Sequence, residues 1–193
     1  MKFTQIPTTA MEEMQLNAGV LLSSFTPSTA EVSGIIGATT GGIKFSATPT
    51  YSDFGEDIDN CPKNMMELKR QDSVEVKISG TFVTVTTAVA KKLMAAADIG
   101  TSDQTKITPR NDLKTEDFAD LWWVGDYSDK NCATNGGFVA IHVMNALNTG
   151  GFQLQSGDKS KGQFAFEFTG HYSIEEQDVV PYEVYIKAGT AEG

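Results

Sequence analysis

The sequence predicts a mainly β protein with one α-helix, folded as an antiparallel β-sandwich or half-barrel. Two regions support this prediction. From Gly150 to Ser173, phenylalanine and leucine alternate with glutamine, alanine and glutamate on both sides of a turn, which is typical of a hairpin with one apolar face. From Ser73 to Thr86, apolar residues alternate with charged and hydroxyl residues, and Gly80 indicates a bulge or a close backbone approach. We therefore expect sheets that bury only one face.

The 193 residues are expected to form a single domain, because this length is sufficient for a proper core. Residues 1–30 are predicted to be an N-terminal arm or a strand, and residues 31–193 the sandwich. Within the sandwich, residues 34–51 are predicted to be a strand interrupted by glycines. The acidic loop over residues 53–62 follows, where glycine, asparagine and proline disfavour a strand.

One helix is predicted over residues 87–98. Val89, Leu93 and Ala97 recur at helical spacing, a threonine stands at the start, and Gly100 stands where the helix should stop.

The second half of the chain is predicted to consist of strands joined by loops. Residues 100–115 form a polar connection, residues 121–124 open a strand, and residues 125–137 form a loop. Residues 138–144 are apolar on both faces, which predicts a strand buried on both sides. Residues 182–186 alternate in a last strand.

The composition argues against a nucleic-acid-binding surface. The net charge is −10, whereas neutralising phosphates requires clustered Lys and Arg. Cys61 and Cys132 are predicted to be free thiols in a reducing compartment, with one disulfide as the alternative. The N-terminus lacks a signal-peptide pattern, and no segment approaches the roughly 20 apolar residues of a transmembrane helix. Synthesis and folding in the cytoplasm are expected.

No catalytic or cofactor-binding motif is found, so we expect neither an enzyme nor a bound cofactor. Residues 37–44 depart from the phosphate-binding loop, because isoleucine separates the second glycine from lysine. His142 and His171 are predicted to be packed or hydrogen-bonded structural residues. Trp122 and Trp123 should point to opposite faces of a strand, which favours packing over sugar binding. The acidic loop does not match a calcium-binding spacing.

Six stretches of the chain resemble the major tail proteins of tailed bacteriophages, the family that forms the tail tube. The similarity covers about residues 34 to 187. The stretches are GGI at 41–43, TYSD at 50–53, GEDIDN at 55–60, SGTFVTV at 79–85, WWVGDYS at 122–128 and GQFAFEFTGHY at 162–172.

This resemblance implies a structural protein of the virion tail, made in the cytoplasm of the host bacterium. Six copies are expected to close into a ring, and rings to stack into a tube that conducts the genome. Strands of neighbouring copies would join in one closed barrel, which removes exposed strand edges. The implied partners are further copies of the chain, a tape-measure protein and tail-completion proteins. DNA passes through without specific binding, and no membrane or cofactor takes part.

A negatively charged lumen would keep DNA centred by repulsion. The polar strand faces are therefore candidates for the lumen, although exposure to solvent explains any single residue equally well. Lys77 has the wrong sign and is predicted to pair with a carboxylate. The lumen-facing candidates are Glu75, Lys77, Ser79, Thr81, Gln163, Glu167 and Thr169. The candidates for contacts between subunits are Asp53, Glu56, Asp57 and Asp59 of the acidic loop.

Two other classes of function are alternatives to the tail tube. A monomeric β-sandwich binding module would recognise a glycan or a host surface through Trp122, Trp123 and the acidic loop. A carboxylate-based hydrolase would need only one suitable pair among 25 acidic residues, which is a weak signal.

Overall fold

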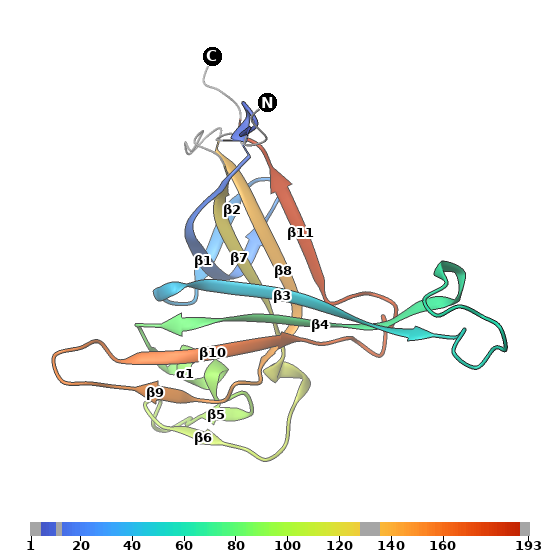
Figure 1. The fold of residues 1–193 in the computed structure, drawn as a ribbon. Helices are drawn as coiled ribbons and strands as arrows, with labels where there is room; N and C mark the ends of the chain where they lie inside the picture. The colour runs from blue at the N-terminus through green and yellow to red at the C-terminus, as the bar shows by residue number, and fades with distance from the viewer. Residues whose placement is uncertain (1–4, 11–12, 128–135, 190–193) are drawn as a thin grey trace.

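Antiparallel strands dominate the computed structural model, which describes residues 5–10, 13–127 and 136–189 (Figure 1). One α-helix, α1 (Thr87–Leu93), and two short 3₁₀ helices, η2 (Met66–Leu68) and η3 (Thr115–Asp117), accompany the strands in these residues. The strands are β1 (Gln15–Thr26), β2 (Glu31–Ile35), β3 (Thr39–Asp53), β4 (Lys69–Phe82), β5 (Ala97–Ile99), β6 (Ile107–Pro109), β7 (Ala119–Tyr127), β8 (Gly137–Asn148), β9 (Gln153–Gln155), β10 (Gln163–Gly170) and β11 (Tyr182–Lys187). The predicted fold class is confirmed.

Nine strands form one continuous sheet that changes direction at β8. Residues 137–146 of β8 pair with β7, and residues 138–143 also pair with β11, whereas Leu147 and Asn148 pair with β10. We call β2, β1, β7, β8 and β11 sheet A, and β9, β10, β4 and β3 sheet B. The strands of sheet A run steeply across those of sheet B (Figure 1). Within the described residues the sheet ends at β2 and β3, with β11 and β9 as side strands on β8 and β10, and it does not close into a barrel.

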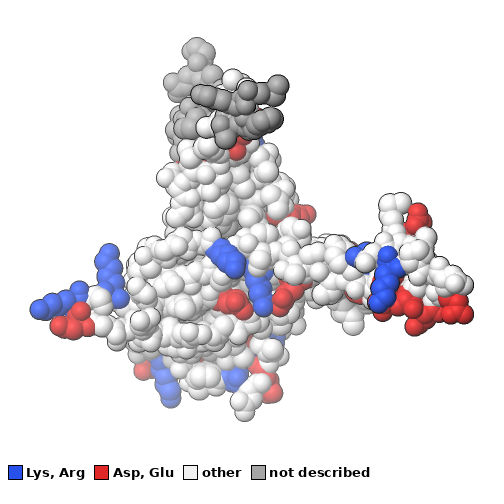
Figure 2. Space-filling model, in the orientation of Figure 1, with Lys and Arg blue, Asp and Glu red and all other residues white. Residues whose placement is uncertain are grey.

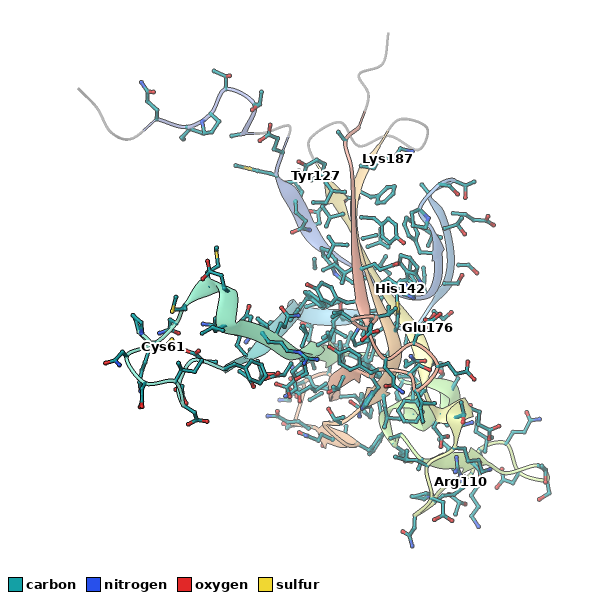
Figure 3. The ribbon with its side chains drawn as sticks, turned by 90° about the vertical axis from the view of Figure 1, so that its right-hand side faces the viewer. Cys61, Arg110, Tyr127, His142, Glu176 and Lys187 are labelled. Carbon is teal, nitrogen blue, oxygen red and sulfur yellow. The ribbon has the colours of Figure 1, made fainter. Side chains whose placement is uncertain are left out.

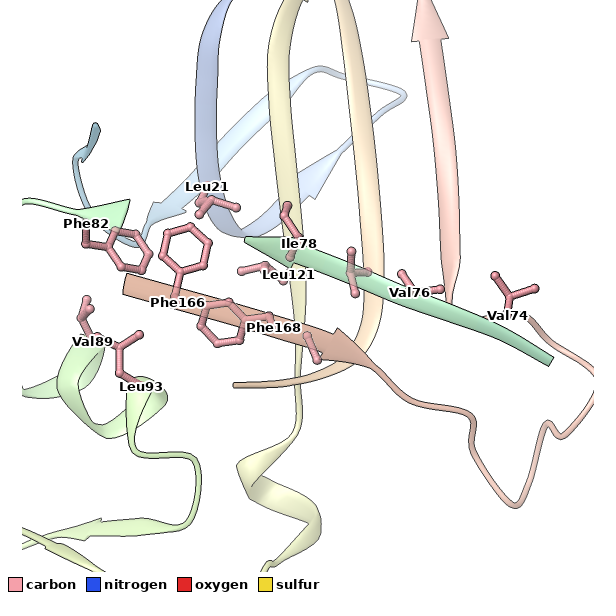
Figure 4. Packing of buried hydrophobic residues seen from close by; sticks show 12 residues of the cluster. Leu21, Val74, Val76, Ile78, Phe82, Val89, Leu93, Leu121, Phe166 and Phe168 are labelled. Atoms are coloured by element: carbon pink, nitrogen blue, oxygen red, sulfur yellow. The ribbon is translucent and has the colours of Figure 1, made fainter. Parts of the chain in front are cut away.

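The main core lies on the inner face of sheet B. The apolar residues of the predicted alternation in β4 are all buried, and they pack with the phenylalanines of β10, with α1 and with sheet A (Figure 4). Phe82 and Phe166 lie 4.4 Å apart by ring centroids. The buried members of this cluster are Leu21, Val74, Val76, Ile78, Phe82, Val89, Leu93, Leu121, Val143, Ala146, Phe166 and Phe168.

Gly80 has the close backbone approach that the sequence predicts. A Cβ atom at this position would lie 2.8 Å from Cζ of Phe166, the residue opposite it on β10. β3 pairs with β4 on the side away from β10, and the register of this pair shifts between Thr40 and Ile43, so the two intervening glycines of β3 form a bulge. The absent side chain thus makes room for a core phenylalanine.

A second apolar cluster lies on sheet A. Trp122 is 8% exposed and packs against Phe25 and Tyr185, while the ring of His142 stacks on it at 4.1 Å. Phe25 belongs to the part of β1 that pairs only with β2, so this hairpin contributes to the cluster. Of the two predictions for residues 1–30, the strand is therefore correct for β1.

The predicted helix is too long at its C-terminal end. Thr86 caps the start as expected, accepting a hydrogen bond from the N–H of Val89 at 3.2 Å. The helix ends at Leu93, however, and Ala95 adopts φ +59°. Gly100 is therefore not the stop signal.

The chain turns there because the next residues enter a small sheet. Ala97, fully buried, begins β5, which pairs with β6 inside the predicted polar connection. Arg110 fixes this pair: its backbone N–H donates to the carbonyl of Ala96, and its guanidinium contacts Asp98 at 2.8 Å and Asp117 at 2.7 Å. These contacts are distant in sequence and outweigh the helical pattern.

The remaining strand predictions are confirmed, except that residues 34–51 form two strands, the end of β2 and most of β3, with residues 36–38 between them. The β9–β10 hairpin has the predicted alternation, and β8 presents one face to each apolar cluster. The loop predicted over residues 125–137 begins later, since β7 continues to Tyr127; residues 128–135 lie outside the described part. No helix in the described ranges is both long enough and apolar enough to cross a membrane.

Asn148 generates a prediction about stability. Its Nδ2 donates to the carbonyls of Leu93 (2.6 Å) and Gly151 (3.0 Å), and its Oδ1 accepts from the N–H of Glu167 (3.0 Å). Asn148→Ala leaves the buried carbonyl of Leu93 and the half-buried hydrogen bonds to Gly151 and Glu167 without this partner, so we expect the free energy of unfolding to fall by roughly 2–4 kcal/mol.

Denaturant titration would measure this loss. The matched control is Gln153→Ala, which removes an exposed amide that donates to the carbonyl of Gly150 at 2.8 Å. The control should change stability by less than about 0.5 kcal/mol. Equal stability of the two variants would show that Asn148 does not hold the sheets together.

Candidate functional site

All seven lumen-facing candidates lie on one face of sheet B, the face turned away from the core. Antiparallel register places Lys77 opposite Thr169, and Ser79 opposite Glu167. Opposite residues on neighbouring antiparallel strands point to the same side. The predicted residues on this face, which we call the polar face, are Glu75, Lys77, Ser79 and Thr81 of β4, and Gln163, Glu167 and Thr169 of β10.

The register adds residues that were missed as site candidates. In β3, Lys44 lies opposite Ser79, and Ser46 and Thr48 follow on the same side. In β9, Gln153 and Gln155 lie opposite β10 residues of the polar face. The alternation of residues 43–48 in the sequence indicates a strand with one polar face. Only the pairing of β3 with β4 shows that this face is the polar face of sheet B.

The polar face is close to neutral. Nζ of Lys77 lies 2.8 Å from a carboxylate oxygen of Glu75 and 3.8 Å from one of Glu167, which confirms the predicted carboxylate partner. The hydrogen bond with Glu75 raises the pKa of Lys77 above its usual value of 10.5. With Lys44 on the same face, two lysines balance two glutamates. The net charge of −10 therefore does not gather here (Figure 2).

The acidic loop lies at the end of a projecting ribbon. β10 pairs with β4 only from Val76 onward, so residues 48–53 and 69–75 extend beyond it as a two-stranded ribbon. We call this ribbon and its loop, residues 48–75, the arm. Figure 3 shows Cys61 on the arm, away from the sheets. Phe54 and Ile58 on the arm are more than half exposed.

The four predicted loop residues divide into two kinds. Asp53 ends β3 and accepts hydrogen bonds from the N–H groups of Asn64 (2.8 Å) and Gly55 (2.9 Å), which lower its pKa in that order. It therefore holds the loop in shape. Glu56, Asp57 and Asp59 are exposed. Among the described residues, no three acidic, histidine or cysteine side chains converge closely enough to hold a metal ion.

Both histidines have structural surroundings, as predicted. Besides stacking on Trp122, His142 lies between two carboxylates: Nε2 is 3.1 Å from Asp120 and Nδ1 is 3.4 Å from Glu183. These three residues come from β7, β8 and β11, which are neighbouring strands of sheet A. The pKa of Glu183 is lowered first by a hydrogen bond from the hydroxyl of Tyr185 and second by a hydrogen bond with His142.

His171 and the remaining predicted residues are placed as follows. Nδ1 of His171 lies 3.1 Å from the carbonyl oxygen of Asn145. Trp123 points to the face opposite Trp122, and its indole N–H donates to the carbonyl of Ala18 at 3.0 Å. Cys61 is partly exposed, whereas Cys132 lies outside the described residues, so the choice between thiols and a disulfide stays a prediction.

The raised pKa of Lys77 predicts a pH dependence. A cationic group whose pKa is higher in the folded state contributes stability that is present below its unfolded pKa and lost as pH rises through its folded pKa. We expect wild type to lose stability relative to Lys77→Met above about pH 10.5.

Denaturant titrations of both proteins between pH 8 and pH 11 would measure the difference. Other titrating groups are common to the pair and cancel. The matched control, Lys106→Met, changes an exposed lysine before β6 and should follow wild type. Identical pH profiles of wild type and Lys77→Met would contradict the ion-pair assignment.

Comparison with family models and with curated proteins finds no match to this chain.

Proposed function

We propose that the chain is a structural virion protein that assembles into stacked rings, which form the tail tube of a bacteriophage and conduct its DNA. The sequence resemblance to major tail proteins supports this proposal and supplies six as the number of copies in a ring. The expected location is the virion tail, and the expected partners are further copies, a tape-measure protein and tail-completion proteins.

The strand directions of sheet B carry the proposal. Its outer strands are β3 and β9, and every neighbouring pair between them is antiparallel. With four strands, β3 and β9 run in opposite directions. A β3 edge can therefore join the β9 edge of the next copy as one more antiparallel pair, and successive copies can extend the sheet until it closes. Closure would satisfy the unpaired backbone groups of both edges.

The two faces of sheet B suit opposite sides of such a barrel. The apolar face is occupied by the subunit's own core, so the polar face is the side available to line the lumen. It offers hydroxyl and amide groups with balanced charge. A surface without clustered Lys or Arg gives DNA little electrostatic attraction, because binding to phosphates depends on such clusters.

The alternative of a glycan-binding module receives less support. Stacking on a sugar requires a free aromatic face, whereas one face of Trp122 is covered by His142 and the residue is 8% exposed. Trp123 packs against the main core.

Electron microscopy tests the proposal directly. Purified protein at high concentration should form rings or tubes about 100 Å across, the size expected for six domains of this size around a channel. Leu154→Lys should abolish them, because it places a charge on the β9 edge, where Leu154 is 57% exposed.

The matched control for this change is Leu113→Lys. Leu113 is 55% exposed and lies outside both edges of sheet B. Circular dichroism should show that both variants fold. A wild-type protein that stays monomeric at high concentration would overturn the proposal, and intact rings of Leu154→Lys would overturn the role of the β9 edge.

The lumen assignment yields a separate prediction. Glu75→Lys/Glu167→Lys should leave tubes intact but impair genome delivery, because the polar face would then carry clustered positive charge that attracts phosphates. Infectivity of particles carrying the variant would measure this. Glu175→Lys/Glu176→Lys makes the same charge change on the loop before β11 and should deliver DNA normally. Unaltered infectivity of the first variant would remove the polar face from the lumen.

A further inference from the structure

Beyond its base, where Val74 is buried in the main core, the arm is a surface that the subunit itself does not cover. Two strands without a third have little stability of their own, and here the arm also exposes large apolar side chains. Tyr51 is 52% exposed, Phe54 59%, Ile58 52% and Met66 82%. Their exposure on one projection indicates that the arm packs against another molecule.

The arm loop is strongly acidic. Residues 53–68 contain five acidic residues and one lysine, a net charge of −4. Near the base of the loop is a cleft of about 600 Å³, lined by the carboxylates of Asp53 and Glu56 and by Lys63 and Lys69, so the charges of the cleft itself balance. The two N–H groups that bind Asp53 hold its carboxylate in place. The arm thus presents negative charge beside apolar side chains.

The opposite end of the same sheet carries the complementary charge. The tip of the β9–β10 hairpin, residues 156–162, contains Lys159 and Lys161 with one aspartate, a net charge of +1. β3 runs toward the arm, and β10 is parallel to it, so the tip that precedes β10 lies at the other end of sheet B. Figures 1 and 2 show the arm and the tip projecting from opposite sides, with red concentrated at the end of the arm.

We propose that the arm of one copy receives the β9–β10 tip of another copy, so that Lys159 and Lys161 meet the carboxylates of the arm loop. A shift along the strand direction brings the two surfaces together. The contact is heterologous, because it joins two different surfaces of the chain. Copies related by a translation do not form a closed ring, so this contact repeats as a filament. It rests on the proposed function and adds to it the surfaces that stack one ring on the next.

This contact differs in kind from the joining of β3 and β9. Edge pairing depends on backbone hydrogen bonds, whereas the contact between arm and tip depends on opposite charges that salt screens. High salt should therefore shorten tubes while leaving rings closed.

Two charge-reversal variants test the proposal. Lys159→Glu/Lys161→Glu makes both ends of the ring acidic. Asp57→Lys/Asp59→Lys raises the net charge of residues 53–68 from −4 to 0 and places two lysines where the tip lysines would bind. Each variant alone should form rings but associate along the axis at least roughly tenfold more weakly than wild type. Mixed in equal amounts, they should form tubes again, because rings of the two kinds can alternate.

Tube length by negative-stain microscopy and ring mass by native mass spectrometry are the readouts. Lys106→Glu/Lys187→Glu makes the same charge change elsewhere and should stack like wild type. If each variant alone forms tubes of normal length, or if mixing does not restore them, the contact between arm and tip is wrong while ring formation stands. If wild type forms no rings, both proposals fail.

Discussion

The side-chain amide of Asn148 ties together the elements on which the rest of the structure depends. Asn148 is the last residue of β8, the strand shared by both sheets. It is 3% exposed, and its three hydrogen bonds reach the end of α1, the turn before β9 and the backbone of β10. A buried amide with all these partners fixes a single arrangement, because any other would leave polar groups unpaired in a low-dielectric core. Asn148 lies where β8 passes from its partners in sheet A to β10 of sheet B, so its hydrogen bonds stabilise the crossing of the two sheets.

Given that crossing, sheet B can bury only one face. Its inner side is filled by phenylalanines, and Gly80 leaves the space that Phe166 needs. Its outer side is free to be polar. A polar face in a two-layer protein usually meets solvent. Sheet B, however, also ends in β3 and β9, which run in opposite directions and whose outer edges pair with no other described strand. This combination of a polar face and joinable edges is what suits a barrel built from several copies.

The arm and the β9–β10 tip project from the two ends of sheet B and offer contacts in a second direction, along the strands. In the proposed tube, edge pairing would add copies across the strands, whereas the arm and the β9–β10 tip lie along them. Backbone hydrogen bonds would then hold the closed ring, and opposite charges would hold one ring on the next. The near-neutral polar face would line the lumen, with the charged surfaces at the ends of the sheet.

The sequence by itself determined the long strands β4, β8 and β10 and their faces, because side-chain direction in a strand alternates with a period of two and needs no distant partner. It therefore placed all seven polar-face candidates on one side, and Thr86 at the start of α1. It could not determine where α1 ends, since burial of Ala97 and the bonds of Arg110 decide this across the chain. Nor could it determine that β3 adds Lys44 to the polar face, because only the register between strands brings these residues together.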